Sequence, residues 1–155
     1  LLAAIGAAVL LIGSCDLLGG GADPVSIEKR IQNFEDGLNS DDRSDLYEGF
    51  HPEAQNYSSI KDAGYWDDTS GIWKKENRDF AIGYSTPSSD ADGMKTVSTT
   101  LTYESTLGSV SRDIRFTMKL GDESTDTVEV WYIYKIEIKD PNTGSWDTVI
   151  KKISP

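Results

Sequence analysis

The chain has 155 residues, a formal net charge of -11 at pH 7 and a single cysteine. The acidic balance argues against nucleic acid as a partner, because phosphate binding requires a surplus of lysine and arginine on one surface. A lone cysteine excludes an internal disulfide and a metal site built from several thiolates. With 37% hydrophobic and 10% aromatic residues, the chain has enough apolar side chains for one domain with one core.

The first segment, residues 1–14, is apolar apart from small residues and ends directly before Cys15. Such a run spans roughly 20 Å as a helix, which is shorter than the roughly 30 Å hydrocarbon core and typical of a secretory signal. Its end, L-L-I-G-S-C, resembles the lipobox of bacterial lipoproteins, in which an aliphatic residue and two small residues precede the modified cysteine. The resemblance implies cleavage before Cys15 and a diacylglyceryl group on its sulfur. We expect this signal peptide to begin before Leu1.

Residues 15–23 are predicted to form a tether, because the glycines at 19–21 allow bending and contribute no side chain to packing. The tether reaches about 15–20 Å and holds the next domain close to a bilayer. Two or three acyl chains on Cys15 anchor firmly, at about 0.8 kcal/mol per buried methylene. We therefore expect a lipid-anchored, extracytoplasmic protein of the cell envelope, periplasmic or surface-exposed. Asp16 resembles an inner-membrane retention signal, and the choice between inner and outer membrane stays open.

Residues 24–155 are predicted to form one domain that begins with an amphipathic helix. Asp23 and Pro24 are typical of a helix start, because aspartate caps the first turn and proline presets its backbone. Apolar residues then recur at helical spacing at Ile27, Ile31, Phe34 and Leu38. One stripe of this helix is expected to face a core.

A second, shorter helix is expected over residues 41–49, with Ser40 as its cap. It should end before Pro52, because proline disfavours helical geometry at the residue that precedes it. The next segment has weak periodicity, and we expect a short strand at 56–60 and a helical turn at 70–76.

The rest of the chain alternates between apolar and polar residues, which predicts strands. Strands are expected at 80–86, 96–104, 111–120, 127–139 and 145–153. The longest is expected to carry on one face Val128, Val130, Tyr132, Tyr134, Ile136 and Ile138. Trp131 then lies on the opposite, partly wet face. Residues 140–144 have turn composition and predict an antiparallel hairpin.

Two helices followed by a run of strands predict an α+β fold in which the helices cover one face of a curved antiparallel sheet. The segment at 31–54, I-Q-N-F-E-D-G-L-N-S-D-D-R-S-D-L-Y-E-G-F-H-P-E-A, resembles the opening of NTF2-like domains of the cystatin-like superfamily. Its features are an amphipathic helix, a polar break, a second helix and an F-H-P-x-A exit. The resemblance implies a cone-shaped fold over nearly all of residues 24–155.

Aromatic residues are the enrichment that bears on binding. Inward tyrosines of a curved sheet can line an amphipathic pocket, or they can fill the core. The ligand-pocket candidates are Tyr84, Tyr103, Tyr132 and Tyr134. Trp131 on the outer face of the sheet is a candidate for a surface that binds a protein partner or a second copy of the chain.

No catalytic residue, metal or cofactor is predicted. An isomerase of the NTF2-like type needs a pocket carboxylate and a tyrosine, whereas most carboxylates here, including the pair Asp122 and Glu123, fall in loops or on wet strand faces. His51 is interpreted as a turn residue. Ser26 to Lys29 matches S-x-x-K by chance. The calcium-like run at 90–93 is interpreted as a polar hairpin turn.

The sequence therefore predicts a membrane-anchored envelope lipoprotein whose domain is a non-enzymatic module that binds a protein partner or a small ligand. The alternative is a small isomerase- or hydrolase-like enzyme that uses a carboxylate and a tyrosine in the cone pocket. A third possibility is a structural or antigenic surface protein without a pocket.

Overall fold

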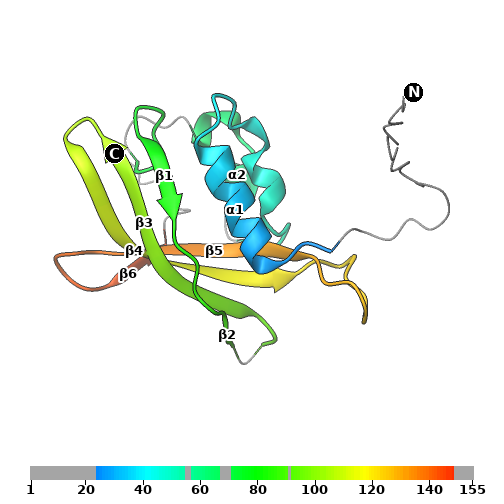
Figure 1. Cartoon of the computed structure of the whole chain (residues 1–155). Helices are drawn as coiled ribbons and strands as arrows, with labels where there is room; N and C mark the ends of the chain where they lie inside the picture. The colour runs from blue at the N-terminus through cyan, green and yellow to red at the C-terminus, as the bar shows by residue number, and fades with distance from the viewer. Residues whose placement is uncertain (1–23, 55–56, 67–70, 91, 149–155) are drawn as a thin grey trace, which may run out of the picture.

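A computed structural model describes residues 24–54, 57–66, 71–90 and 92–148. The predicted signal peptide, Cys15 and the tether lie outside these residues. In the described part of the chain, helices from the N-terminal third pack on a six-stranded antiparallel sheet (Figure 1). The predicted α+β class, with N-terminal helices on an antiparallel sheet, is confirmed. No helix in the described residues has the length and apolar character needed to cross a bilayer.

Helix α1 (Ile27–Leu38) begins later than Pro24, so the predicted start is wrong. Val25 is held in an isolated bridge with Val130, because its N–H donates to the Glu129 carbonyl at 3.0 Å. The helix is instead capped by Ser26, whose hydroxyl accepts from the Lys29 backbone N–H at 3.1 Å. The S-x-x-K run thus forms a helix cap. The predicted apolar stripe is confirmed, since all its members are buried.

Short helical segments connect α1 to the sheet. They are the 3-10 helix η1 (Ser44–Gly49), the helix α2 (Tyr57–Ile60) and the 3-10 helix η2 (Ala63–Tyr65). The second predicted helix is therefore shorter and tighter than expected. The strand predicted at 56–60 is wrong over the described residues 57–60, because the backbone there bonds within its own turn, with Lys61 N–H donating to the Tyr57 carbonyl at 3.1 Å. Residues 71–76 form turns and not a helical turn.

The sheet has the order β1-β3-β4-β5-β6, and β2 pairs with β3. Its strands are β1 (Arg78–Ile82), β2 (Ser88–Ser89), β3 (Lys95–Ser105), β4 (Gly108–Leu120), β5 (Trp131–Lys139) and β6 (Trp146–Thr148). The strand predicted at 80–86 ends at Ile82 as part of β1, β2 was not predicted, and the predicted strand at 127–139 starts only at Trp131. The predicted hairpin at 140–144 is confirmed, with Asp140 N–H donating to the Ser145 carbonyl at 2.8 Å. Residues 149–153 lie outside the described residues.

A bulge reverses the face pattern of β5. Thr117 pairs with Lys135 and Met118 pairs with Ile133, which leaves Tyr134 as the extra residue. Trp131 therefore faces the core with Ile133, and it is only 3% exposed. The predicted outer-face position of Trp131 is wrong, and so is the single face predicted for Tyr132, Tyr134, Ile136 and Ile138.

The free edge of β1 is covered by side chains of α1 and its cap. Asn39 donates from Nδ2 to the Phe80 carbonyl and accepts from the Phe80 N–H, each at 2.8 Å. Glu35 accepts from the Ile82 N–H at 2.5 Å. Because an unpaired edge invites a further strand, these contacts close one end of the sheet and fix α1 beside it.

Phe34 is the centre of the core between α1 and the sheet. Its ring lies 5.7 Å from that of Phe50 and 6.0 Å from that of Phe116, both edge to face. It makes the same type of contact with Trp66 at 5.8 Å and Trp73 at 5.6 Å. One residue of α1 thus holds the exit segment, the 60–77 connection and β4 together.

We predict that Phe34→Ala lowers the free energy of unfolding by about 3–5 kcal/mol, because the cavity left by the ring removes contacts to several elements at once. Urea denaturation of the purified chain measures this value. Leu107→Ala is the control, since Leu107 is 99% exposed and its truncation should change stability by less than about 0.5 kcal/mol. A similar, small effect of both substitutions would contradict the central role of Phe34.

Candidate functional site

The tyrosines predicted to line a pocket do not converge inside the fold. Tyr103 is 6% exposed and stacks on Phe80 with ring centroids 5.5 Å apart, so it fills the core, and burial raises its pKa. Tyr84 follows β1 and is 44% exposed. Tyr132 and Tyr134 lie together beside His51, whose ring is 6.2 Å from each of theirs. Of the four, Tyr132 lines the candidate site and Tyr134 lies beside it.

A cleft of about 250 Å³ is lined by Tyr132 and borders the aromatic core at Phe50. We call it the tyrosine cleft. Side chains that bear on binding come from η1, the exit segment, α2, the loop after β4 and the start of β5: Tyr47, Glu48, His51, Tyr57, Asp122, Glu123 and Tyr132. The cleft therefore combines phenol rings, carboxylates and one imidazole, drawn from segments far apart in the sequence.

Tyr132 links the cleft to α1. Its hydroxyl donates to the Glu123 carboxylate, and the Arg30 guanidinium lies 4.4 Å from the centre of its ring. Arg30 is held there because its Nε donates to the Trp131 carbonyl at 2.7 Å. The Tyr132 hydrogen bond lowers the pKa of Glu123, and the same bond, with burial, raises the pKa of Tyr132. Burial lowers the pKa of Arg30.

The loop passes close to Tyr132 because residue 121 is a glycine. A Cβ at Gly121 would lie 2.6 Å from Cε2 of Tyr132, which is too close for any side chain. The Gly121 N–H donates to the Val130 carbonyl at 2.9 Å and closes the base of the loop. Gly121 thus permits the approach that brings Glu123 to Tyr132.

His51 is buried, with 2% exposed area, and its backbone N–H donates to the Ile133 carbonyl at 2.9 Å. Its Nδ1 accepts from the Glu53 N–H at 3.1 Å, so the predicted turn role is confirmed. A neutral imidazole that accepts at Nδ1 carries its proton on Nε2. In the described part of the chain this Nε2–H has no hydrogen-bond acceptor, although His51 lines the cleft.

Basic side chains lie at the rim of the cleft. The Lys61 ammonium is 5.6 Å from the ring centres of both Tyr47 and Tyr57. Lys119 pairs with Glu53 and lies 5.5 Å from the ring centre of Tyr134. That pairing raises the pKa of Lys119 and lowers that of Glu53. Tyr134 is therefore engaged by a cation beside the cleft.

Sequence reasoning missed most of this site. It placed Asp122 and Glu123 in a solvated loop and His51 in a turn, and it gave Arg30 no role. The signal in the sequence that could have found the site was the loop between two predicted antiparallel strands, because such a loop brings the chain back beside the strand that it left. That return brings Glu123, at the start of the loop, beside Tyr132 on the following strand.

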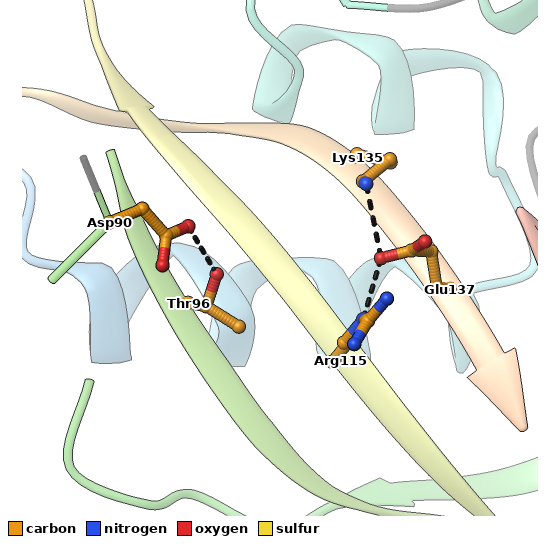
Figure 2. A network of polar contacts seen from close by, with 5 residues as sticks. All are labelled: Asp90, Thr96, Arg115, Lys135 and Glu137. Carbon is orange, nitrogen blue, oxygen red and sulfur yellow. Dashed lines mark hydrogen bonds and ion pairs between the residues drawn. The ribbon is translucent and has the colours of Figure 1, made fainter. Parts of the chain in front are cut away.

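A second polar cluster lies on the face of the sheet opposite α1 (Figure 2). Glu137 accepts from Arg115 Nε at 2.6 Å and pairs with Lys135 at 3.2 Å. The Arg115 guanidinium lies 4.5 Å from the centre of the Trp146 ring. The Arg115 hydrogen bond lowers the pKa of Glu137 and raises the pKa of Arg115. These charges satisfy one another, so we interpret the cluster as a brace across β4, β5 and β6.

The described residues contain no group of three or more histidine, cysteine or acidic side chains arranged to hold a metal ion. The polar hairpin turn predicted at 90–93 is closed by Asp90, whose N–H donates to the Met94 carbonyl at 2.9 Å between β2 and β3, and residue 91 lies outside the described residues. Asp90 also accepts from the Thr96 hydroxyl at 2.7 Å (Figure 2). Compared with known proteins, the chain matches no family model and no curated sequence.

We predict that Glu137→Gln lowers the free energy of unfolding at pH 7 by about 1 kcal/mol, a modest value because the partners are partly solvated. The lowered pKa of Glu137 means that its stabilisation is complete above the ordinary glutamate pKa of about 4.3 and is lost as the pH falls through the lowered value. The difference in the free energy of unfolding between the wild-type chain and Glu137→Gln should therefore narrow towards pH 2. Thermal unfolding across this range measures it, with the exposed Glu76→Gln as control.

We predict that Tyr132→Phe raises the pKa of the Glu123 carboxyl towards its ordinary value, because the hydrogen bond that holds it down is removed. The ring, and with it the Arg30 contact, is retained. A carbon-detected NMR titration of the glutamate carboxyl groups follows the change. Tyr84→Phe is the matched control, and an unchanged Glu123 titration in Tyr132→Phe would show that the pair does not form in solution.

Proposed function

We propose that this chain is a lipid-anchored protein of the cell envelope and that its domain binds a small ligand in the tyrosine cleft. The L-L-I-G-S-C run supports the anchor, through diacylglyceryl attachment at Cys15. The domain would then work outside the cytoplasm at a membrane surface, on the inner or the outer membrane. We also propose that the domain is NTF2-like. What supports this is the α+β order of elements together with the burial of Phe50, His51 and Ala54 in the F-H-P-x-A exit.

The observation that carries the binding proposal is the division of the aromatic residues. The rings around Phe34 pack against one another between α1 and the sheet. The tyrosines of the cleft instead line a concave site beside carboxylates and the imidazole of His51. A concave site with apolar walls and a few convergent polar groups is typical of ligand binding.

The enzymatic alternative has weaker support. Glu123 and Tyr132 form the carboxylate and phenol pair that an isomerase needs, but they lie outside the aromatic core. A general base works best with a pKa near the working pH. The hydrogen bond lowers the pKa of Glu123 and raises that of Tyr132, so both shifts move away from neutrality.

A protein partner or second copy on the outer face of the sheet stays a prediction, now without Trp131 as its anchor. The Arg115, Glu137 and Trp146 cluster occupies part of that face. Its charges are mutually paired, which favours a structural role there over partner binding. The cleft is therefore the better-supported site.

We predict that Cys15→Ser abolishes labelling of the chain by radioactive palmitate in bacterial cells and moves the protein out of the membrane fraction, because serine lacks the thiol that is acylated. Ser14→Ala is the matched control, since alanine keeps a small residue before the cysteine and should retain labelling. Persistent labelling of the Cys15→Ser chain would contradict the proposed anchor, independently of any result on the cleft.

A further inference from the structure

We propose that the tyrosine cleft binds a small amino alcohol, holding its ammonium group between tyrosine rings and carboxylates and its hydroxyl on His51. This inference rests on the proposed binding function and assigns the chemical class of the ligand. It follows from the rings, the charges, the His51 donor that faces the cleft and the size of the cleft.

The rings of the cleft already contact cations of the same chain. Arg30 lies 4.4 Å from the ring centre of Tyr132, and Lys61 lies 5.6 Å from those of Tyr47 and Tyr57. Cations within about 6 Å of a tyrosine ring are attracted by its electron-rich face. Arg30 is fixed to a backbone carbonyl, whereas the Lys61 side chain is exposed and makes no ion pair with a described residue. Lys61 thus occupies a position that an external ammonium can take.

The carboxylates of the cleft retain hydrogen-bonding capacity. Within the described residues, no ion pair engages Glu48 or Asp122. Glu123 accepts a hydrogen bond from Tyr132, and an ionised carboxylate has further acceptor positions for N–H donors. The net charge of -11 also favours the approach of cations to the chain as a whole.

His51 defines the second feature of the ligand. Its ring is largely buried, with 2% of the residue exposed, and its Nε2–H has no acceptor among the described residues and is not one of the buried unpaired atoms. Because His51 lines the cleft, a ligand that supplies an acceptor there adds a hydrogen bond. An anionic acceptor would be repelled by Glu48, Asp122 and Glu123. A neutral hydroxyl satisfies the donor without that repulsion.

The cleft volume of about 250 Å³ fits a molecule with a few heavy atoms. It lies below the roughly 300–1,000 Å³ of pockets for drug-sized ligands. A lysine side chain of a partner protein shares the ammonium chemistry but has no hydroxyl near the ammonium for His51. The combined requirements therefore favour a free amino alcohol over a basic protein side chain.

The test is an NMR titration of the purified full chain in a nonionic detergent at constant ionic strength, following the ring resonances of His51 and Tyr132. Ethanolamine is expected to bind saturably and at least about threefold more tightly than ethylamine, which lacks the hydroxyl. Ethylene glycol, which lacks the ammonium, is expected to produce no saturable shift. N-acetyl-lysinamide represents the side chain of a protein partner and is expected to bind more weakly than ethanolamine.

Variants separate the parts of the site. Lys61→Met is expected to tighten ethanolamine binding about twofold to fivefold, because it removes the internal cation from the Tyr47 and Tyr57 rings. Lys139→Met changes the net charge equally but lies about 23 Å along β5 from Tyr132, and it should leave the affinity unchanged. Glu123→Gln is expected to weaken binding about tenfold.

Equal binding of ethylene glycol and ethanolamine would overturn the ammonium assignment while leaving a binding function for the cleft. Tighter binding of N-acetyl-lysinamide than of ethanolamine would overturn the assignment to an amino alcohol. The absence of saturable shifts with every probe, in both the wild-type chain and Lys61→Met, would overturn the proposal. None of these results depends on palmitate labelling at Cys15, so failure of the ligand assignment and failure of the anchor are distinguishable.

Discussion

The packing of Phe34 against aromatic rings from separate segments is the constraint on which the rest of the domain depends. Because its ring contacts Phe50, the exit segment lies against the core at one fixed place. The next residue, His51, then bonds through its backbone to Ile133 and turns its side chain towards Tyr132 and Tyr134. The core therefore sets the position of the His51 imidazole, although Phe34 lies in the apolar core and His51 lines the polar cleft.

A second constraint is the buried Arg43, which holds the irregular connection between η1 and β1. Its guanidinium donates to the carbonyls of Trp66 at 3.2 Å and Trp73 at 2.6 Å. A buried charge is tolerated where its donors are paired. Here the guanidinium donors satisfy backbone carbonyls that would otherwise be paired within a helix or a sheet. The tryptophans so placed are the rings that surround Phe34. The polar contacts of Arg43 and the ring contacts of Phe34 thus hold the same two tryptophans in place.

Much of the fold follows from periodicity, and most of the site does not. The helical stripe of α1 is a local pattern and is present as predicted, and the strand predicted at 111–120 is present within β4, where Ile114, Phe116 and Met118 are buried at alternate positions. The bulge at Tyr134 adds one residue to β5, and a shift of one residue exchanges the faces of a strand. Alternation alone therefore placed Trp131 on the wrong face. The return of the loop after β4 indicates that Glu123 lies near Tyr132, but the contact of Arg30 with Tyr132 depends on tertiary proximity, which residue spacing does not encode.

The cleft lies at the end of the domain where the N-terminal segment enters. Val25 is bridged to Val130, and the Val130 carbonyl accepts from Gly121 at the base of the cleft loop. Tyr132 follows two residues later, about 7 Å along the strand. With the proposed anchor at Cys15 and a tether that reaches about 15–20 Å, the cleft would stay close to the bilayer surface. Ligand and membrane would then meet the same end of the domain, which is why the anchor and the cleft belong to one functional proposal.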